Sequence, residues 1–156
     1  MMEKTILSDA SPLEAHLGFW LRFVSNQVSS RFEKLLVAHD TSVTEWVAMR
    51  TLYRASYVTH AELINALGMT KGTASKVISR LESKGLANRR PAADSSREQA
   101  LCLTKKGNRL VPELAAFADE NDTFFFGHLS NAKRLELMKI MKDLVSYHQM
   151  KKVPTR

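Results

Sequence analysis

Apolar residues recur at steps of three and four positions along the first quarter of the chain, which is the spacing of one face of an α-helix. Ser11 and Pro12 suit an N-cap and a first helical position, and Glu14 follows the cap by three residues. We therefore expect a long amphipathic helix from this point to about His39. The residues on its apolar face are Leu13, Leu17, Trp20, Val24, Val28, Phe32 and Leu35.

The pattern over residues 42–85 predicts three short helices, the last two joined by a tight turn. Two Ser/Thr-x-x-Glu sequences, which begin at Ser42 and Thr59, have the spacing of a capping box. The helix that Thr59 opens stops at Gly68, a residue suited to a left-handed C-terminal position, and Thr70 is the candidate N-cap of the next helix. Two short helices joined by a three- or four-residue turn that contains glycine are typical of a helix-turn-helix.

After residue 85 the helical periodicity stops. Residues 86–90 and 99–103 read as two short strands, and the polar residues 91–97 between them form a turn, so we expect a β-hairpin. Two more helices follow, the first capped by Thr104 and the second starting near Ser130. The element order predicts a mainly α-helical fold with a small β-hairpin, the arrangement of a winged helix-turn-helix.

The length of 156 residues suits a single domain, which we take as residues 1–156. Within it, residues 42–107 form the predicted winged-helix lobe. The terminal helices, residues 11–40 and 108–150, would be underpacked in one copy of this chain. Pairing them with those of a second copy buries their apolar faces, and two-fold dimers are the commonest closed assembly. We therefore predict a homodimer.

The net charge of +7 is concentrated in the middle of the chain. Residues 42–110 carry twelve Lys and Arg against five Asp and Glu, whereas the rest carries eleven of each. A basic segment between neutral ones is the pattern of a module that binds a polyanion, and double-stranded DNA is the partner that a helix-turn-helix indicates. The alternative is an ordinary solvated basic face.

The candidate DNA contacts lie on the second helix of the turn and on the hairpin. A helix that presents donors and small hydroxyl residues suits base edges in the major groove, and arginines on a hairpin suit the minor groove. The alternative for both sets is a polar surface without a partner. The helix candidates are Thr70, Lys71, Gly72, Thr73, Ser75, Lys76, Ser79 and Arg80; the hairpin candidates are Arg89, Arg90 and Arg97.

Other classes of function lack their sequence signatures. No stretch approaches the roughly 18 apolar residues of a membrane-spanning helix, and no secretory signal follows Met1. The five histidines lack metal-binding spacing, and Cys102 has no recognisable base beside it, so we expect neither a metal site nor an enzyme. We also expect no cofactor and no membrane partner. The lone cysteine fits the reducing cytoplasm, where we place the protein.

The chain resembles the multiple antibiotic resistance regulator (MarR) family in residues 70–86, 89–91 and 103–107. The specific sequences are Leu-Glu-x-Lys-Gly-Leu and Leu-Thr-x-x-Gly. The resemblance implies a homodimer that binds a pseudo-palindromic operator, usually as a repressor, with Thr70 to Arg80 in the major groove and Arg97 as the arginine of the hairpin tip. The family commonly has Asp-x-Arg at that tip, whereas here Asp94 lies three residues before Arg97.

The resemblance also implies release by a small ligand, often an aromatic acid bound between the dimer helices and the DNA-binding lobe. Aromatic walls and a partner for a carboxylate are available on the first two helices. Each residue also has a simpler interpretation, because the tryptophans suit the core and Arg50 suits a phosphate. The candidates are His16, Trp20, Arg22, Trp46 and Arg50.

The leading hypothesis is therefore a sequence-specific transcriptional repressor. The alternatives are a winged-helix module that binds another protein, such as an antirepressor, and an architectural protein that binds DNA without sequence preference. DNA binding would weaken steeply with salt because phosphate contacts release counterions. A protein-interaction module would show little affinity for DNA.

Overall fold

The structure, a computed structural model, describes residues 9–92 and 95–150, and for residues 92 and 95–98 it describes the backbone only. The predicted fold class is confirmed: the chain is mainly helical, with a small antiparallel sheet. The elements in order are a 3-10 turn η1 (Leu13–Ala15), α1 (Leu17–Val37), α2 (Val43–Leu52), β1 (Val58–Thr59), α3 (His60–Leu67), α4 (Lys71–Ser83), β2 (Ala87–Ala92), β3 (Ser95–Leu103), α5 (Lys105–Phe126) and α6 (Asn131–Tyr147).

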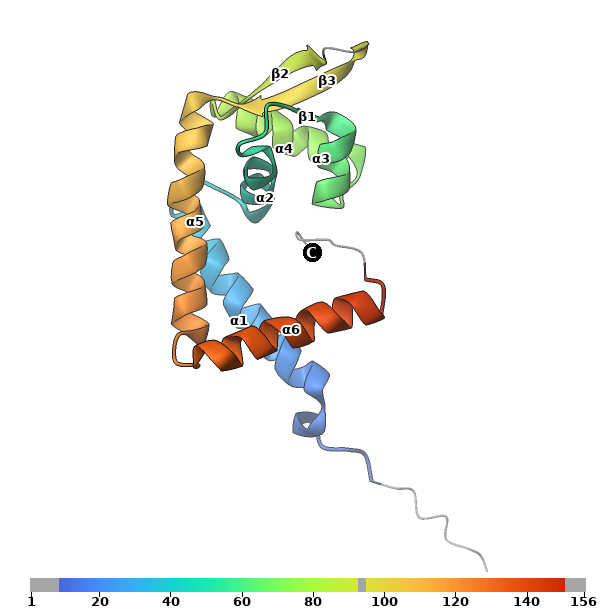
Figure 1. Cartoon of the computed structure of the whole chain (residues 1–156), viewed down its shortest axis with the longest axis vertical. Helices are drawn as coiled ribbons and strands as arrows, with labels where there is room; N and C mark the ends of the chain where they lie inside the picture. Colours follow the sequence, from blue (N-terminus) through green and yellow to red (C-terminus); the bar gives the residue numbers. More distant parts are fainter. Residues whose placement is uncertain (1–8, 93–94, 151–156) are drawn as a thin grey trace, which may run out of the picture.

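These elements form a compact lobe and an extended helical part (Figure 1). The lobe contains α2, α3, α4 and the three strands. Helices α1 and α5 pack against each other and lead away from the lobe, and α6 lies at the far end of α5. The lobe corresponds to the predicted winged-helix segment, and the extended part contains the predicted terminal helices.

The helices of the lobe begin where side chains satisfy the first backbone N–H groups. Ser42 and Thr59 each accept a hydrogen bond from the backbone N–H three residues later, and the carboxylate of the glutamate at that position accepts one from the backbone N–H of the cap residue, so both predicted capping boxes are confirmed. Thr70 and Thr104 cap α4 and α5 in the same way, but no glutamate stands three residues after them to complete a capping box. Gly68 ends α3 with φ 62°, the left-handed conformation that glycine adopts without strain.

The predicted start of the first helix is wrong. Residues 13–15 form only a 3-10 turn, and α1 begins at Leu17 because His16 has an extended backbone, with φ −96° and ψ 125°. The residue that precedes the turn is Pro12, which has no polar side chain, and no side-chain cap bond is present there. The expected capping by Ser11 therefore does not occur.

The sheet has the strand order β1-β3-β2, with both pairings antiparallel. The hairpin is longer than predicted, since β3 begins at Ser95. Its register becomes irregular between Pro91 and Ala92. The sequence pattern does not reveal β1, a two-residue strand in which Val58 pairs with Leu101.

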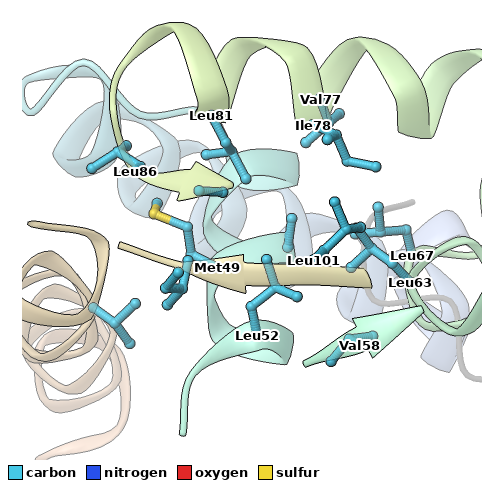
Figure 2. Close-up of a cluster of buried hydrophobic side chains, with 14 of the residues drawn as sticks. Met49, Leu52, Val58, Leu63, Leu67, Val77, Ile78, Leu81, Leu86 and Leu101 are labelled. Atoms are coloured by element: carbon cyan, nitrogen blue, oxygen red, sulfur yellow. The ribbon is translucent and has the colours of Figure 1, made fainter. Parts of the chain in front are cut away.

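The hydrophobic core lies in the lobe, between α4 and the other helices and strands. Figure 2 shows Val77, Ile78 and Leu81 of α4 directed toward the side chains of the neighbouring elements. Ile78 and Leu81 are buried, as are Met49 of α2 and Leu101 of β3. This packing fixes one face of α4 in the lobe and leaves its opposite face to solvent.

The terminal helices expose apolar side chains instead. No residue of α6 is buried; Leu135, for example, is 71% exposed. At the start of α1, Leu17 is 89% exposed. The prediction that the terminal helices are underpacked in one copy is confirmed for the start of α1 and for α6, whereas α5 buries Val111 and Leu114. None of the helices in residues 9–92 and 95–150 is both long and apolar enough to cross a membrane.

Candidate nucleic-acid interface

Helix α4 presents a polar face to solvent at the surface of the lobe. Its buried side chains are Ala74, Val77, Ile78 and Leu81. Helical geometry places Gly72, Lys76 and Ser79 opposite this buried face, and all three are accessible to solvent. Thr70 caps the helix, and its hydroxyl also donates to the hydroxyl of exposed Thr73 (3.0 Å). Most of the predicted helix candidates are therefore brought together on one accessible surface.

The three cations of α4 are available to a ligand. Lys71, Lys76 and Arg80 are accessible, and none forms a side-chain hydrogen bond or an ion pair with the part of the chain that the structure describes. A cation without an internal partner can bind a phosphate or a base edge without first breaking a bond. Three such cations on one helix are compatible with binding to DNA.

Gly72 leaves open space beside this helix. A Cβ atom added there would meet no atom within 4 Å. Its small size is therefore not required by packing inside this chain. The absence of a side chain would allow a molecule outside the chain to approach the backbone of α4 at Gly72.

Ser75 has a different orientation from the other helix candidates. Its side chain is half-buried, and its Oγ atom lies 3.5 Å from Nε2 of His60, the first residue of α3. The side chain thus faces the preceding helix of the turn. It is less accessible to a base than Lys76 is.

Arg89 of the hairpin is held in internal contacts. Its guanidinium donates hydrogen bonds to Glu82 (2.6 Å) and Ser79 (3.2 Å) of α4 and to Gln99 of β3 (3.4 Å). The sequence pattern does not identify Glu82 or Gln99, because their roles depend on the register of the hairpin against α4. Arg89 therefore connects the hairpin to α4, and part of its charge is balanced by Glu82.

The two other hairpin arginines have different surroundings. Successive residues of a strand point to opposite faces, so Arg90 projects from the face opposite to that of Arg89. Arg97 belongs to β3, but its side chain is outside what the structure describes, and Asp94 lies outside the described residues altogether. The expectations for Arg97 and Asp94 stay predictions.

The lowered pKa of His60 indicates a positive electrostatic potential at the start of α4. Burial lowers its pKa below the ordinary value of 6.5, and the charges of Arg89 and Lys71 lower the pKa further. The charges that disfavour a proton on His60 would favour an anion at the same place. The N-terminus of α4 adds the positive end of a helix dipole.

The candidate ligand residues form two separate groups in one copy of the chain. Trp20 donates a hydrogen bond to the carbonyl of Glu14 (2.8 Å), on the part of the chain that also carries His16 and Arg22. Trp46 packs against Phe32 of α1. Phe32 lies twelve residues after Trp20 on the same helix, which corresponds to about 18 Å along the helix axis.

On α2, the guanidinium of Arg50 lies 5.7 Å from the centre of the Tyr53 ring, a cation–π contact. The five predicted ligand residues do not enclose one pocket within a single chain.

The potential metal ligands among the described residues do not cluster, and Cys102 lies in the hairpin. No group of three or more His, Cys, Asp or Glu side chains there could hold a metal ion. The thiol of Cys102 lies 3.9 Å from the backbone carbonyl of Asn88, within the hairpin.

Comparison with known proteins agrees with this geometry. Residues 41–98 match the model of the MarR family. A relative named transcriptional regulator HosA, from Escherichia coli O127:H6, is 25% identical over 126 residues, which are 81% of this chain and 92% of the relative. The resemblance to the MarR family is therefore confirmed, and the relative is a named regulator of transcription.

Two solved structures share the fold at low sequence identity. One concerns the regulation of DNA binding of BpsR from Bordetella bronchiseptica by 6-hydroxynicotinic acid; the TM-score is 0.75 at 20% identity, over 87% of this chain and 97% of that one. The other is a complex of MepR from S. aureus with DNA; the TM-score is 0.74 at 21% identity, and the match covers 85% of this chain and 98% of that one. These likenesses confirm the winged-helix fold.

Proposed function

We propose that this chain, whose residues 41–98 are a MarR-family domain, is a sequence-specific DNA-binding repressor that acts as a homodimer on a pseudo-palindromic operator. One observation carries the proposal: α4 is buried in the lobe on one face, and its exposed Lys71, Lys76 and Arg80 have no internal side-chain partners among the described residues. The basic segment 42–110 supplies the surrounding positive potential.

In this proposal α4 is the recognition helix and enters the major groove. Lys76, beside the open space at Gly72, contacts base edges, and Lys71 and Arg80 contact bases or phosphates at the two sides. Arg97 enters the minor groove at the tip of the hairpin. Arg89 has a different role from the predicted one, because it holds the hairpin against α4 through Glu82 and Ser79.

The homodimer is supported by the exposed apolar faces of the terminal helices. These helices, within residues 11–40 and 108–150, are the proposed dimerisation segments, and residues 42–107 are the DNA-binding lobe. A groove of about 240 Å³ between α5 and α6 is lined in part by Phe126, Leu137, Met138 and Met141, and it offers an apolar surface to a second copy. A two-fold dimer would present two copies of α4, as an inverted repeat requires.

We further propose that a small aromatic acid releases the protein from DNA. An acid of this class, 6-hydroxynicotinic acid, regulates DNA binding by BpsR, which shares the fold of this chain. In this chain the two groups of candidate residues, around Trp20 and around Trp46, would have to meet across the dimer. A change in tryptophan fluorescence on titration with aromatic acids, together with loss of DNA affinity, tests this step. An affinity that no such acid changes would contradict it.

The salt dependence of binding to a DNA duplex tests the proposed class of function. Several phosphate contacts predict that the logarithm of the affinity falls linearly and steeply with the logarithm of the salt concentration. Negligible affinity for DNA at low salt would favour the protein-interaction module. Steep salt dependence with equal affinity for all sequences would favour the architectural protein.

A further inference from the structure

Lys84, directly after the recognition helix, connects four elements of the fold. Its ammonium group donates hydrogen bonds to the backbone carbonyl of Asp40 (2.6 Å) and to Oε2 of Glu45 (2.9 Å). It also forms an ion pair with the carboxylate of Asp40 (3.6 Å), and its own carbonyl accepts a hydrogen bond from Lys106 of α5 (3.0 Å). One residue thus joins the end of α4 to the turn after α1, to the start of α2 and to α5.

The carboxylate of Glu45 is a fixed anchor for Lys84. It is buried, with 4% of the side chain exposed, and the same oxygen that binds Lys84 accepts the backbone N–H of Ser42 (3.3 Å). Because the capping box at the start of α2 already holds this carboxylate, it cannot follow a displacement of Lys84 by rotating. A charged hydrogen bond to a fixed buried partner is strong and directional.

The opposite end of this connection belongs to the dimerisation helices. Asp40 follows α1 and has φ 52°, a left-handed backbone conformation that is uncommon for residues other than glycine. The carbonyl that Lys84 binds therefore belongs to a tight turn at the end of α1. Helix α1 is itself tied to α5, since Arg31 donates hydrogen bonds to the buried Asn121 (3.1 Å) and to Glu120 (3.1 Å). Core packing holds one face of α4, and Lys84 adds a polar link from the end of α4 to the turn after α1, to α2 and to α5.

We propose that the Lys84–Glu45 pair is a positioning element that sets the angle of each recognition helix relative to the dimerisation helices, and so the spacing between half-sites that the protein accepts. This inference rests on the proposed function. A helix of 13 residues is about 20 Å long, so a tilt of about 10° at Lys84 moves the other end by about 3.5 Å. This displacement is close to the rise of one base pair.

The consequence of losing the pair differs from the loss of a DNA contact. Lys84 would touch neither bases nor phosphates in this proposal, and without it the base-reading side chains keep their arrangement on the surface of α4. We therefore expect the preferred half-site to be unchanged, while the tolerance to the distance between half-sites increases.

The experiment measures affinity for duplexes that carry the selected half-site as an inverted repeat, with the centre-to-centre distance changed in steps of one base pair. For the wild type we expect a single optimum and a loss of about ten-fold one step away. Lys84→Met and Glu45→Gln should flatten this profile, so that the affinities at neighbouring distances differ by no more than about three-fold. Lys84→Arg, which keeps the positive charge, should retain the profile of the wild type. Lys34→Met on α1 is the control, since it removes the same charge from an exposed side chain.

The outcomes separate this inference from the proposed function. A Lys84→Met profile with the optimum and sharpness of the wild type, or an equal loss at every distance, would overturn the role of the pair. Wild-type protein without sequence preference would overturn the proposed function itself. If Lys84→Met does not fold, the Lys84→Met/Glu45→Gln double variant, which leaves no unpaired buried charge, takes its place in the same measurement.

Discussion

The Nε atom of Arg89 in β2 lies 2.6 Å from Oε1 of Glu82 in α4, and this ion pair joins the base of the hairpin to that helix. Both side chains are about one-third exposed. The same guanidinium contacts Ser79, one turn before Glu82 on α4. The hairpin and the helix thus form one unit, and an arginine that the sequence suggests as a DNA contact has its bonds within the protein.

The first prediction compares Arg80 with Arg89. Arg80→Met should lower DNA affinity and reduce the slope of the salt dependence by about 1, because it removes a free cation from the interface. Arg89→Met should instead lower the free energy of unfolding by at most about 1 kcal/mol, the range of a partly exposed ion pair. Salt titrations and urea unfolding of both variants check this. A salt slope for Arg89→Met that is smaller than that of the wild type by about 1 would show that Arg89 contacts phosphate.

The second prediction concerns the reading of bases. Lys76→Ala should change which bases are preferred in the half-site, because Lys76 lies on the outward face of α4. Ser75→Ala should leave the preference unchanged, because Ser75 faces His60. Binding to a library of single-base variants of the operator measures both. If Lys76→Ala weakens all sequences equally, Lys76 contacts phosphate.

The third prediction concerns the tip of the hairpin. Arg97→Ala should lower affinity for all sequences, with only a modest effect on preference, because the minor groove attracts arginine chiefly through its negative potential. Arg90→Ala is the matched comparison, since Arg90 projects from the face of β2 opposite to Arg89 and should have the smaller effect. Unchanged binding by Arg97→Ala would remove the hairpin tip from the interface.

The fourth prediction concerns pH. The pKa of His60 is lower in the folded protein than its ordinary value of about 6.5, so the unfolded chain takes up this proton first as the pH falls. The contribution of His60 to stability therefore decreases as the pH falls through about 6.5. Chemical unfolding of wild type and His60→Gln over pH 5–8 should show the stability of the wild type falling relative to the variant at the acidic end. A constant difference between the two would refute this assignment.

The fifth prediction concerns the dimer. Ile140→Glu places a charge among the exposed apolar side chains of α6 and should produce monomers, because burying an unpaired charge at an interface is costly. Ser146→Glu adds the same charge to an exposed polar position of α6 and should leave the dimer intact. Sedimentation velocity measures the mass of both variants. A dimeric Ile140→Glu protein would exclude this face from the interface.

The local chemistry of the chain predicts most of the fold. The caps at Ser42, Thr59, Thr70 and Thr104 depend on residues only three positions apart, so sequence spacing is sufficient to identify them. The start of α1 differs from the prediction because the extended backbone of His16 interrupts a pattern that otherwise suits a helix. The periodicity of a sequence does not report one such residue.

The site is only partly predictable, because its details depend on contacts between distant residues. The spacing in α4 identifies Lys76 as outward-facing, but it does not show that Arg89 reaches Glu82 or that Ser75 reaches His60. Those contacts depend on the packing of α3 and of the hairpin against α4. The bond from Lys84 to Glu45 spans 39 residues and has no local signature at all.

The most direct test of the proposed function is the selection of bound DNA from a random pool, with purified protein at near-physiological salt. We expect an enriched inverted repeat whose half-site centres lie about 10–10.5 base pairs apart, because two copies of α4 would then meet successive major grooves on one face of the duplex. If folded, dimeric protein enriches no sequence, the sequence-specific repressor is contradicted.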